Sequence, residues 1–135
     1  MKLSAQPFVD TNVLLYLLSD DLDKAARAEA LLMARIVVSV QVLNEFANVA
    51  RRKLGLEWRQ VKQALLDLRR FAEICPLTLD THVRGLALAS RYQLSIYDAM
   101  IAAAALEAGC TTLASEDFSA GQQFEGLLTV RNPFA

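Results

Sequence analysis

Short apolar runs alternate with longer segments of helical periodicity along the whole of this 135-residue sequence. The apolar runs are expected to be strands at 7–10, 36–39, 111–114 and 127–130, and a short strand or an extended link at 74–77. The helical segments are expected at 12–18, 22–35, 40–54, 58–71, 79–92 and 95–109. Strands that alternate with helices indicate a parallel sheet covered on both faces, with right-handed crossovers. The sequence therefore predicts one α/β domain over residues 1–135, built as a three-layer α/β/α sandwich around a short sheet.

Four acidic residues stand at comparable places in this pattern. Asp10 and Asp117 come directly after strands, Glu45 lies within two turns of another strand end, and Asp98 stands at a helix start. Ligands of open α/β sheets sit beside the carboxyl ends of the strands. The four carboxylates are therefore expected to meet at one edge of the sheet.

Each of these acids also has an ordinary explanation. Asp10 can cap the following helix, Asp98 can complete a capping box with Ser95, Asp117 can be a turn residue and Glu45 a solvated helix residue. Four carboxylates gathered at one edge would repel strongly unless a cation held them. Oxygen ligands of this kind suit Mg²⁺ or Mn²⁺, and the usual chemistry of such a site is phosphoryl transfer.

Four motifs then resemble, in order, the acidic motifs of the PIN domain. They are Phe8-Val9-Asp10-Thr11-Asn12, Leu43-Asn44-Glu45-Phe46, Tyr97-Asp98-Ala99 and Ser115-Glu116-Asp117. The overall size and the ending Asn132-Pro133-Phe134 are similar to the VapC toxins of bacterial toxin–antitoxin pairs. The resemblance implies strand order 3-2-1-4-5 and a cytoplasmic, Mg²⁺-dependent endoribonuclease, with Mn²⁺ as a second candidate ion. It also implies a homodimer built beside the active sites, and inhibition by a VapB antitoxin whose tail enters the acidic cleft.

The resemblance assigns roles by position. Asp10, Glu45, Asp98 and Asp117 match the catalytic and metal-binding quartet. The supporting polar residues are Thr11, Asn12, Ser115 and Glu116. Either Glu116 or Asp117 can supply the fourth carboxylate, and the motif register favours Asp117.

Basic and aromatic residues outside the quartet are candidates for RNA contacts. Arg51, Arg52 and Lys53 can follow a phosphate backbone. Trp58 and Tyr97 can stack on bases or pack in a core or dimer interface. Arg69 and Arg70 can also follow an RNA backbone, but a solvated helix end explains them equally well.

His82 is the only histidine. Acid–base cleavage through the 2′-hydroxyl commonly needs a pair of such groups, so a metal-activated water is the favoured mechanism. Products with 5′-phosphate and 3′-hydroxyl ends are then expected.

Two other functions compete with the nuclease. A haloacid-dehalogenase-like phosphatase also places an acid after its first strand, but it requires an aspartate where Asn12 stands. A non-catalytic module that binds metal or RNA is the other alternative.

Composition adds bounds on location and assembly. A net charge of −1 argues against a generally basic nucleic-acid binder, although an acidic pocket can mask basic patches in that sum. Residues 1–6 show no signal-peptide core and no apolar run reaches bilayer length, which predicts a cytoplasmic protein without a membrane segment. Cys75 and Cys110 lack zinc-site spacing. The 54% hydrophobic content favours elements covered on several sides, or a dimer.

Overall fold

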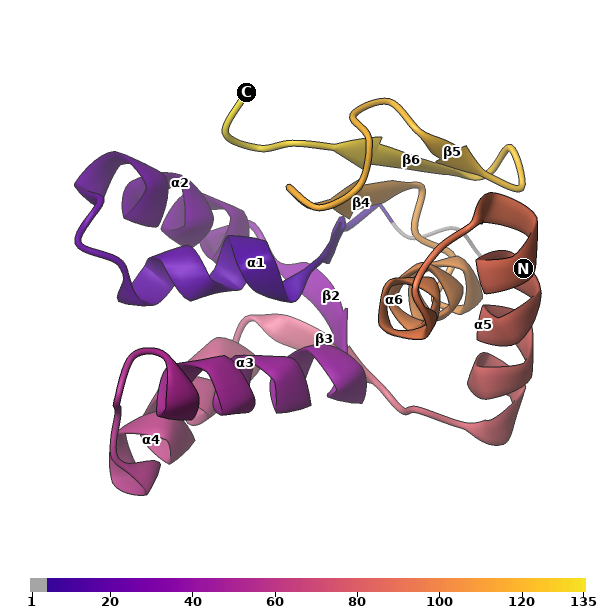
Figure 1. The fold of residues 1–135 in the computed structure, drawn as a ribbon. Helices are drawn as coiled ribbons and strands as arrows, with labels where there is room; N and C mark the ends of the chain where they lie inside the picture. Colours follow the sequence, from indigo (N-terminus) through magenta and orange to yellow (C-terminus); the bar gives the residue numbers. More distant parts are fainter. Residues whose placement is uncertain (1–4) are drawn as a thin grey trace.

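The computed structural model describes residues 5–135 and folds them into a mainly parallel sheet with helices on both faces (Figure 1). The prediction drawn from residues 1–6 concerns in part residues 1–4, which lie outside the described part. Within residues 5–135, none of the helices is long and apolar enough to cross a membrane. In chain order the elements are β1 (Phe8–Val9), α1 (Thr11–Leu14), the 3-10 helix η1 (Leu15–Leu18), α2 (Leu22–Met33), β2 (Ile36–Ser39), α3 (Val40–Arg52), α4 (Trp58–Arg69), β3 (Ala72–Cys75), α5 (Leu79–Tyr92), α6 (Ile96–Glu107), β4 (Thr112–Ala114), β5 (Gln123–Phe124) and β6 (Leu128–Arg131).

The strand order is β3-β2-β1-β4-β6-β5. All neighbouring pairs are parallel except β5 with β6. The five predicted strands thus lie in the predicted order 3-2-1-4-5, with β6 as the fifth. The antiparallel strand β5 was not predicted, because it has no apolar run of its own and forms by pairing with β6.

The chain reverses direction across the sheet at β1. It moves outward from β1 to β2 and β3, then crosses back to β4 on the other side of β1. Right-handed crossovers in opposite directions put helices on opposite faces, and α1–α4 lie on one side with α5 and α6 on the other (Figure 1). The carboxyl ends of β1 and β4 therefore form a topological switch point, where such sheets bind ligands.

The core lies on both faces of the central strands. Phe8, Val37 and Leu113 on neighbouring strands are fully buried. Helix α6 is buried at every residue from Ala99 to Leu106, between the sheet and α5. This all-round burial explains why its sequence is uniformly apolar.

Several predicted boundaries need correction. The segment 12–18 is not one α-helix: α1 begins at Thr11 and gives way to η1 at Leu15, a change that an apolar sequence does not encode. The helices predicted to reach residues 35, 54 and 71 end at Met33, Arg52 and Arg69. Arg35 has a φ of 74°, a left-handed conformation that cannot continue the helix. The third strand occupies 72–75, and 76–77 are irregular because Pro76 interrupts them.

Candidate acidic site at the carboxyl edge of the sheet

Asp10 is the buried centre of the site. It follows β1 directly, and its backbone N–H donates to the Ala114 carbonyl of β4 at 2.9 Å, which fixes it between the two strands. The side chain is only 3% exposed and its Oδ1 accepts a hydrogen bond from the Thr11 amide at 2.7 Å. The capping interpretation of Asp10 is therefore confirmed. Burial, with a smaller contribution from the charges of Glu45 and Asp117, raises the pKa of Asp10 to about 6 against the lowering effect of its hydrogen bonds.

Two polar side chains orient the second oxygen of Asp10. The Ser115 hydroxyl donates to Asp10 Oδ2 at 2.8 Å, and Asn12 Nδ2 donates to the same oxygen at 3.3 Å. Asn12 Oδ1 in turn accepts from the Glu116 amide at 3.1 Å. The polar residues beside the first and fourth acids thus form one network across β1 and β4. The amide at Asn12 occupies the place where a dehalogenase-like phosphatase would need a second aspartate.

Glu45 lies on α3. Ser39 caps this helix through a hydrogen bond from the Val42 amide to its hydroxyl at 3.4 Å, so the helix begins directly at the end of β2. Glu45 Oε2 accepts from the Thr11 hydroxyl at 3.3 Å, and Oε1 accepts from Gln41 Nε2 at 2.8 Å. The carboxylate is thereby turned toward the end of β1 and is not simply solvated.

Asp98 and Asp117 form the more accessible part of the site. Ser95 caps α6 through the Asp98 amide at 3.2 Å, which places Asp98 in the first turn. Burial and the charge of Asp117 raise the pKa of Asp98. Asp117 is exposed, and its amide donates to the Ser115 hydroxyl at 3.1 Å. The charge of Asp117 contributes to the raised pKa of both Asp10 and Asp98, so Asp117 lies within electrostatic reach of both carboxyls.

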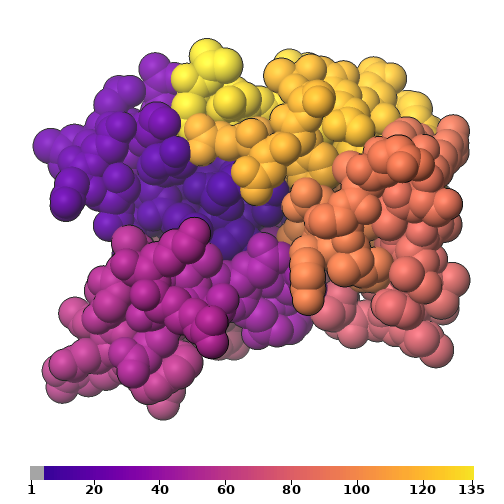
Figure 2. Space-filling view, viewed as in Figure 1, coloured from indigo at the N-terminus to yellow at the C-terminus, as the bar shows by residue number. Residues whose placement is uncertain are grey.

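The four segments meet at the middle of one face of the molecule, where parts of the chain far apart in sequence adjoin (Figure 2). Among residues 5–135, no lysine or arginine forms an ion pair with Asp10, Glu45, Asp98 or Asp117. No three His, Cys, Asp or Glu side chains in this part of the chain already stand close enough to enclose one ion. These acids therefore do not form a preformed ligand cage.

The donor set fits a hard divalent cation. All four side chains offer carboxylate oxygens, the ligands preferred by Mg²⁺ and Mn²⁺, and the buried Asp10 lacks a cationic partner among the described residues. A bound cation would favour the charged form of Asp10, whose pKa burial has raised.

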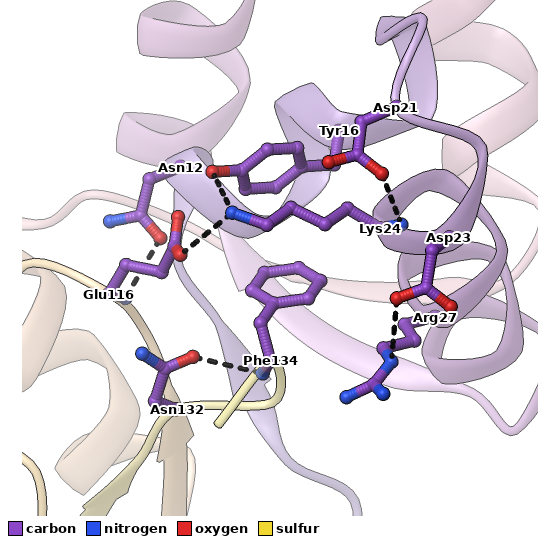
Figure 3. Close-up of polar contacts among 9 residues, drawn as sticks. All are labelled: Asn12, Tyr16, Asp21, Asp23, Lys24, Arg27, Glu116, Asn132 and Phe134. Carbon is purple, nitrogen blue, oxygen red and sulfur yellow. Dashed lines mark hydrogen bonds and ion pairs between the residues drawn. The ribbon is translucent and has the colours of Figure 1, made fainter.

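Glu116 lies differently from Asp117. Its carboxylate turns toward α2, where Glu116 Oε2 is 3.8 Å from Lys24 Nζ (Figure 3). Its backbone amide still contacts Asn12. This arrangement favours Asp117 as the fourth acid, in agreement with the motif register.

The basic residues predicted to bind RNA are exposed at the end of α3 and just beyond it. The guanidinium of Arg51 donates to the Leu56 carbonyl at 3.1 Å and lies 5.2 Å from the centre of the Trp58 ring, so it ties α3 to α4. Lys53 instead lines an open groove of about 550 Å³ together with Asn12, Tyr16 and Val49.

Tyr97 and Trp58 are 66% and 56% exposed, so neither is a core residue of the monomer. His82 is exposed on α5, outside the contacts of the acidic cluster described above.

Two residues in the site's surroundings escaped sequence-based prediction. Gln41 holds Glu45, and its only signal is the i, i+4 spacing on one helix. Lys24 contacts Glu116 across 92 positions of sequence, for which no local pattern exists.

The family model described as the PIN domain matches residues 8–120. No curated protein sequence matches. Among solved structures, a toxin–antitoxin complex from Klebsiella pneumoniae is 23% identical with a TM-score of 0.72, covering 95% of this chain and 98% of its own. VapC20 from Mycobacterium tuberculosis, a sarcin–ricin loop cleaving toxin, is 21% identical with a TM-score of 0.69, covering 84% and 92%. DNA-bound VapBC from Salmonella typhimurium is 17% identical with a TM-score of 0.67, covering 96% and 99%.

Proposed function

This chain belongs to the PIN domain family, and on that premise we propose that it is a Mg²⁺- or Mn²⁺-dependent endoribonuclease. The observation that supports the proposal is that Asp10, Glu45, Asp98 and Asp117 lie on segments that end near the switch point of the sheet, where the charges of Glu45 and Asp117 act on Asp10 and that of Asp117 acts on Asp98. These four residues would hold the ion. Once bound, it would supply positive charge against the phosphodiester and lower the pKa of a water molecule.

The chain's own residues have distinct tasks in this proposal. Ser115 and Asn12 fix the carboxylate of Asp10, while Thr11 and Gln41 fix that of Glu45. Such outer contacts keep ligands oriented before any ion arrives. Asp98 and Asp117 stand on the solvent side, where RNA and the attacking water have access.

The surface beside the cluster suits a single-stranded nucleic acid. The groove lined by Asn12 also carries the ammonium of Lys53, opposed by the carboxylate of Asp20, and Lys53 is the lining group that can contact a phosphate. Tyr97 is exposed directly beside Asp98 and offers a ring on which a base can stack. Both features support RNA as the substrate.

The test is cleavage of total RNA by purified protein with Mg²⁺ or Mn²⁺. We expect fragments with 5′-phosphate and 3′-hydroxyl ends, lost on adding a chelator and lost in Asp10→Asn. The matched control is Asp80→Asn, the same exchange in the first turn of α5. If the wild type cuts no RNA that Asp10→Asn leaves intact, the proposal is wrong.

The same preparations address the non-catalytic alternative. A sequestering module would bind RNA in Mn²⁺ without cutting it, and its toxicity would not change in Asp98→Asn. The nuclease proposal expects toxicity to be lost in that variant.

We further propose that the enzyme is the toxin of a type II toxin–antitoxin pair. Solved structures with this fold include toxin–antitoxin complexes, and the open acidic cluster can receive a basic peptide tail. Co-expression with a small reading frame directly upstream should restore growth and yield a complex that does not cleave RNA. Growth arrest that no neighbouring frame relieves would argue against this assignment.

A homodimer is supported by the outer face of α5. Leu79, Val83 and Leu86 recur at helical spacing and are 76%, 57% and 50% exposed, which is unusual for an apolar stripe facing water. Light scattering is expected to give twice the monomer mass, and Val83→Arg to give the monomer. A monomeric wild type would contradict the prediction.

A further inference from the structure

Lys24 of α2 is held by two aromatic rings that come from opposite ends of the chain. Its Nζ lies 4.7 Å from the centre of the Tyr16 ring and 5.5 Å from that of Phe134, and it donates to the Tyr16 hydroxyl at 3.2 Å. The two rings contact each other edge to face, with their centres 4.7 Å apart (Figure 3). Cation–π contacts and the hydrogen bond therefore fix the direction of the ammonium.

The ammonium points at Glu116. The Lys24 and Glu116 side chains are 35% and 25% exposed, so their charges are screened less than those of a surface pair. Among the described residues, this is the one ion pair that involves a residue of the Ser115-Glu116-Asp117 motif. The Glu116 amide meanwhile contacts Asn12, which binds Asp10.

From these contacts we propose that Lys24 is a positioning residue. Clamped between Tyr16 and Phe134, it holds and neutralises the Glu116 carboxylate on the α2 side, outside the acidic cluster. The inference rests on the proposed nuclease function, because the cluster that it protects is the proposed metal site. Without Lys24, Glu116 would add a fifth uncompensated negative charge beside the path of an anionic substrate.

The expected effects on RNA binding and on metal binding differ. In Lys24→Met the KM for RNA should rise about fivefold, the effect of one unit charge at close range in water. The affinity for Mn²⁺, measured calorimetrically, should not fall, because an added negative charge does not repel a cation. The kcat should stay within about twofold, since Lys24 does not touch the reacting atoms in this proposal.

Rescue identifies the partner of Lys24. Adding Glu116→Gln to Lys24→Met should return KM to near the wild-type value, and Lys24→Arg should keep it there. Glu116→Gln alone should lower KM. The control Arg27→Met removes a positive charge from the same helix, where Arg27 pairs with Asp23 (Figure 3), and should not raise KM as Lys24→Met does.

Two results would overturn the inference. If Glu116→Gln fails to restore KM, Lys24 contacts RNA directly. If Mn²⁺ affinity, kcat and the thermal midpoint all fall together without rescue, Lys24 is only structural.

A wild type without nuclease activity would end the proposed function but still leave the pair testable. In metal-free protein, the thermal midpoint of the double variant should then be no lower than that of Lys24→Met alone. Additive losses would show that Lys24 and Glu116 are not coupled.

Discussion

The interior of the sheet and its carboxyl edge are built in opposite ways. Along α6, residues 99–106 are buried and apolar, and they contact α5 and the sheet without a charged group. At the edge, Asp10 is equally buried yet carries a carboxyl whose pKa is raised to about 6. The interior is arranged for stability, whereas the edge keeps a group that weakens the metal-free fold at neutral pH.

The largest expected difference between the two regions is in activity. Asp10→Asn keeps the size of the side chain and can retain the cap on Thr11, so circular dichroism and the thermal midpoint should show a folded protein. Cleavage should fall by at least about 100-fold, since the central ligand is lost. Retained cleavage in this variant would remove Asp10 from the site.

Truncation in the interior should give the reverse result. Leu106→Ala removes a side chain that is 2% exposed at the far end of α6 and should lower the free energy of unfolding by about 3 kcal/mol. Cleavage per folded molecule should be unchanged. Urea unfolding and active-site-normalised rates test this, and a specific loss of activity would mean that the two regions are coupled.

The dependence of stability on pH should separate the regions further. A carboxyl with a higher pKa in the folded state binds its proton more tightly there, so its contribution is greatest at low pH. The contribution of Asp10 to stability declines as pH rises from about 4, its pKa in the unfolded state, to about 6, its pKa in the folded state. Over this range, in metal-free protein, the free energy of unfolding of Asp10→Asn should rise relative to that of the wild type by on the order of 2 kcal/mol. Urea unfolding of both proteins at each pH measures this difference. A difference in free energy of unfolding that stays constant with pH would contradict the prediction.

The smallest expected effect concerns the support of Asp10. Ser115→Ala removes the 2.8 Å hydrogen bond to Oδ2 and the acceptor for the Asp117 amide. The affinity for Mn²⁺ should fall about tenfold, as is usual when a ligand loses an orienting contact. Ser119→Ala, in the exposed loop that follows, is the control. Equal Mn²⁺ affinities in the two variants would show that Asp10 needs no such support.

The two regions also differ in how far the sequence predicts them. Helix α5 has the predicted bounds, and in the structure Thr78 caps its start; α6 begins after Ser95, the cap that the sequence predicts. Asp10 was found because an apolar run ends on it. These signals are local, and local capping or periodicity is what a sequence displays directly.

Features that depend on distant partners were missed or left open. Strand β5 exists only by pairing with β6, and Gln41 gains its role from the direction in which Glu45 points. The choice between Glu116 and Asp117 depends on Lys24, which lies on another helix. These features depend on tertiary contacts, which the residues next to them in the sequence do not indicate.

The bond between Ser115 and Asp10 spans 105 positions of sequence, which has a consequence for synthesis on the ribosome. At ~5–20 residues per second, roughly 5–20 s separate the emergence of the first acid from that of its orienting serine. A nascent chain that already displays Asp10, Glu45 and Asp98 therefore lacks both the serine that orients Asp10 and the fourth acid, Asp117. An enzyme that attacks RNA would in this way remain harmless to the messenger and ribosome that are still producing it.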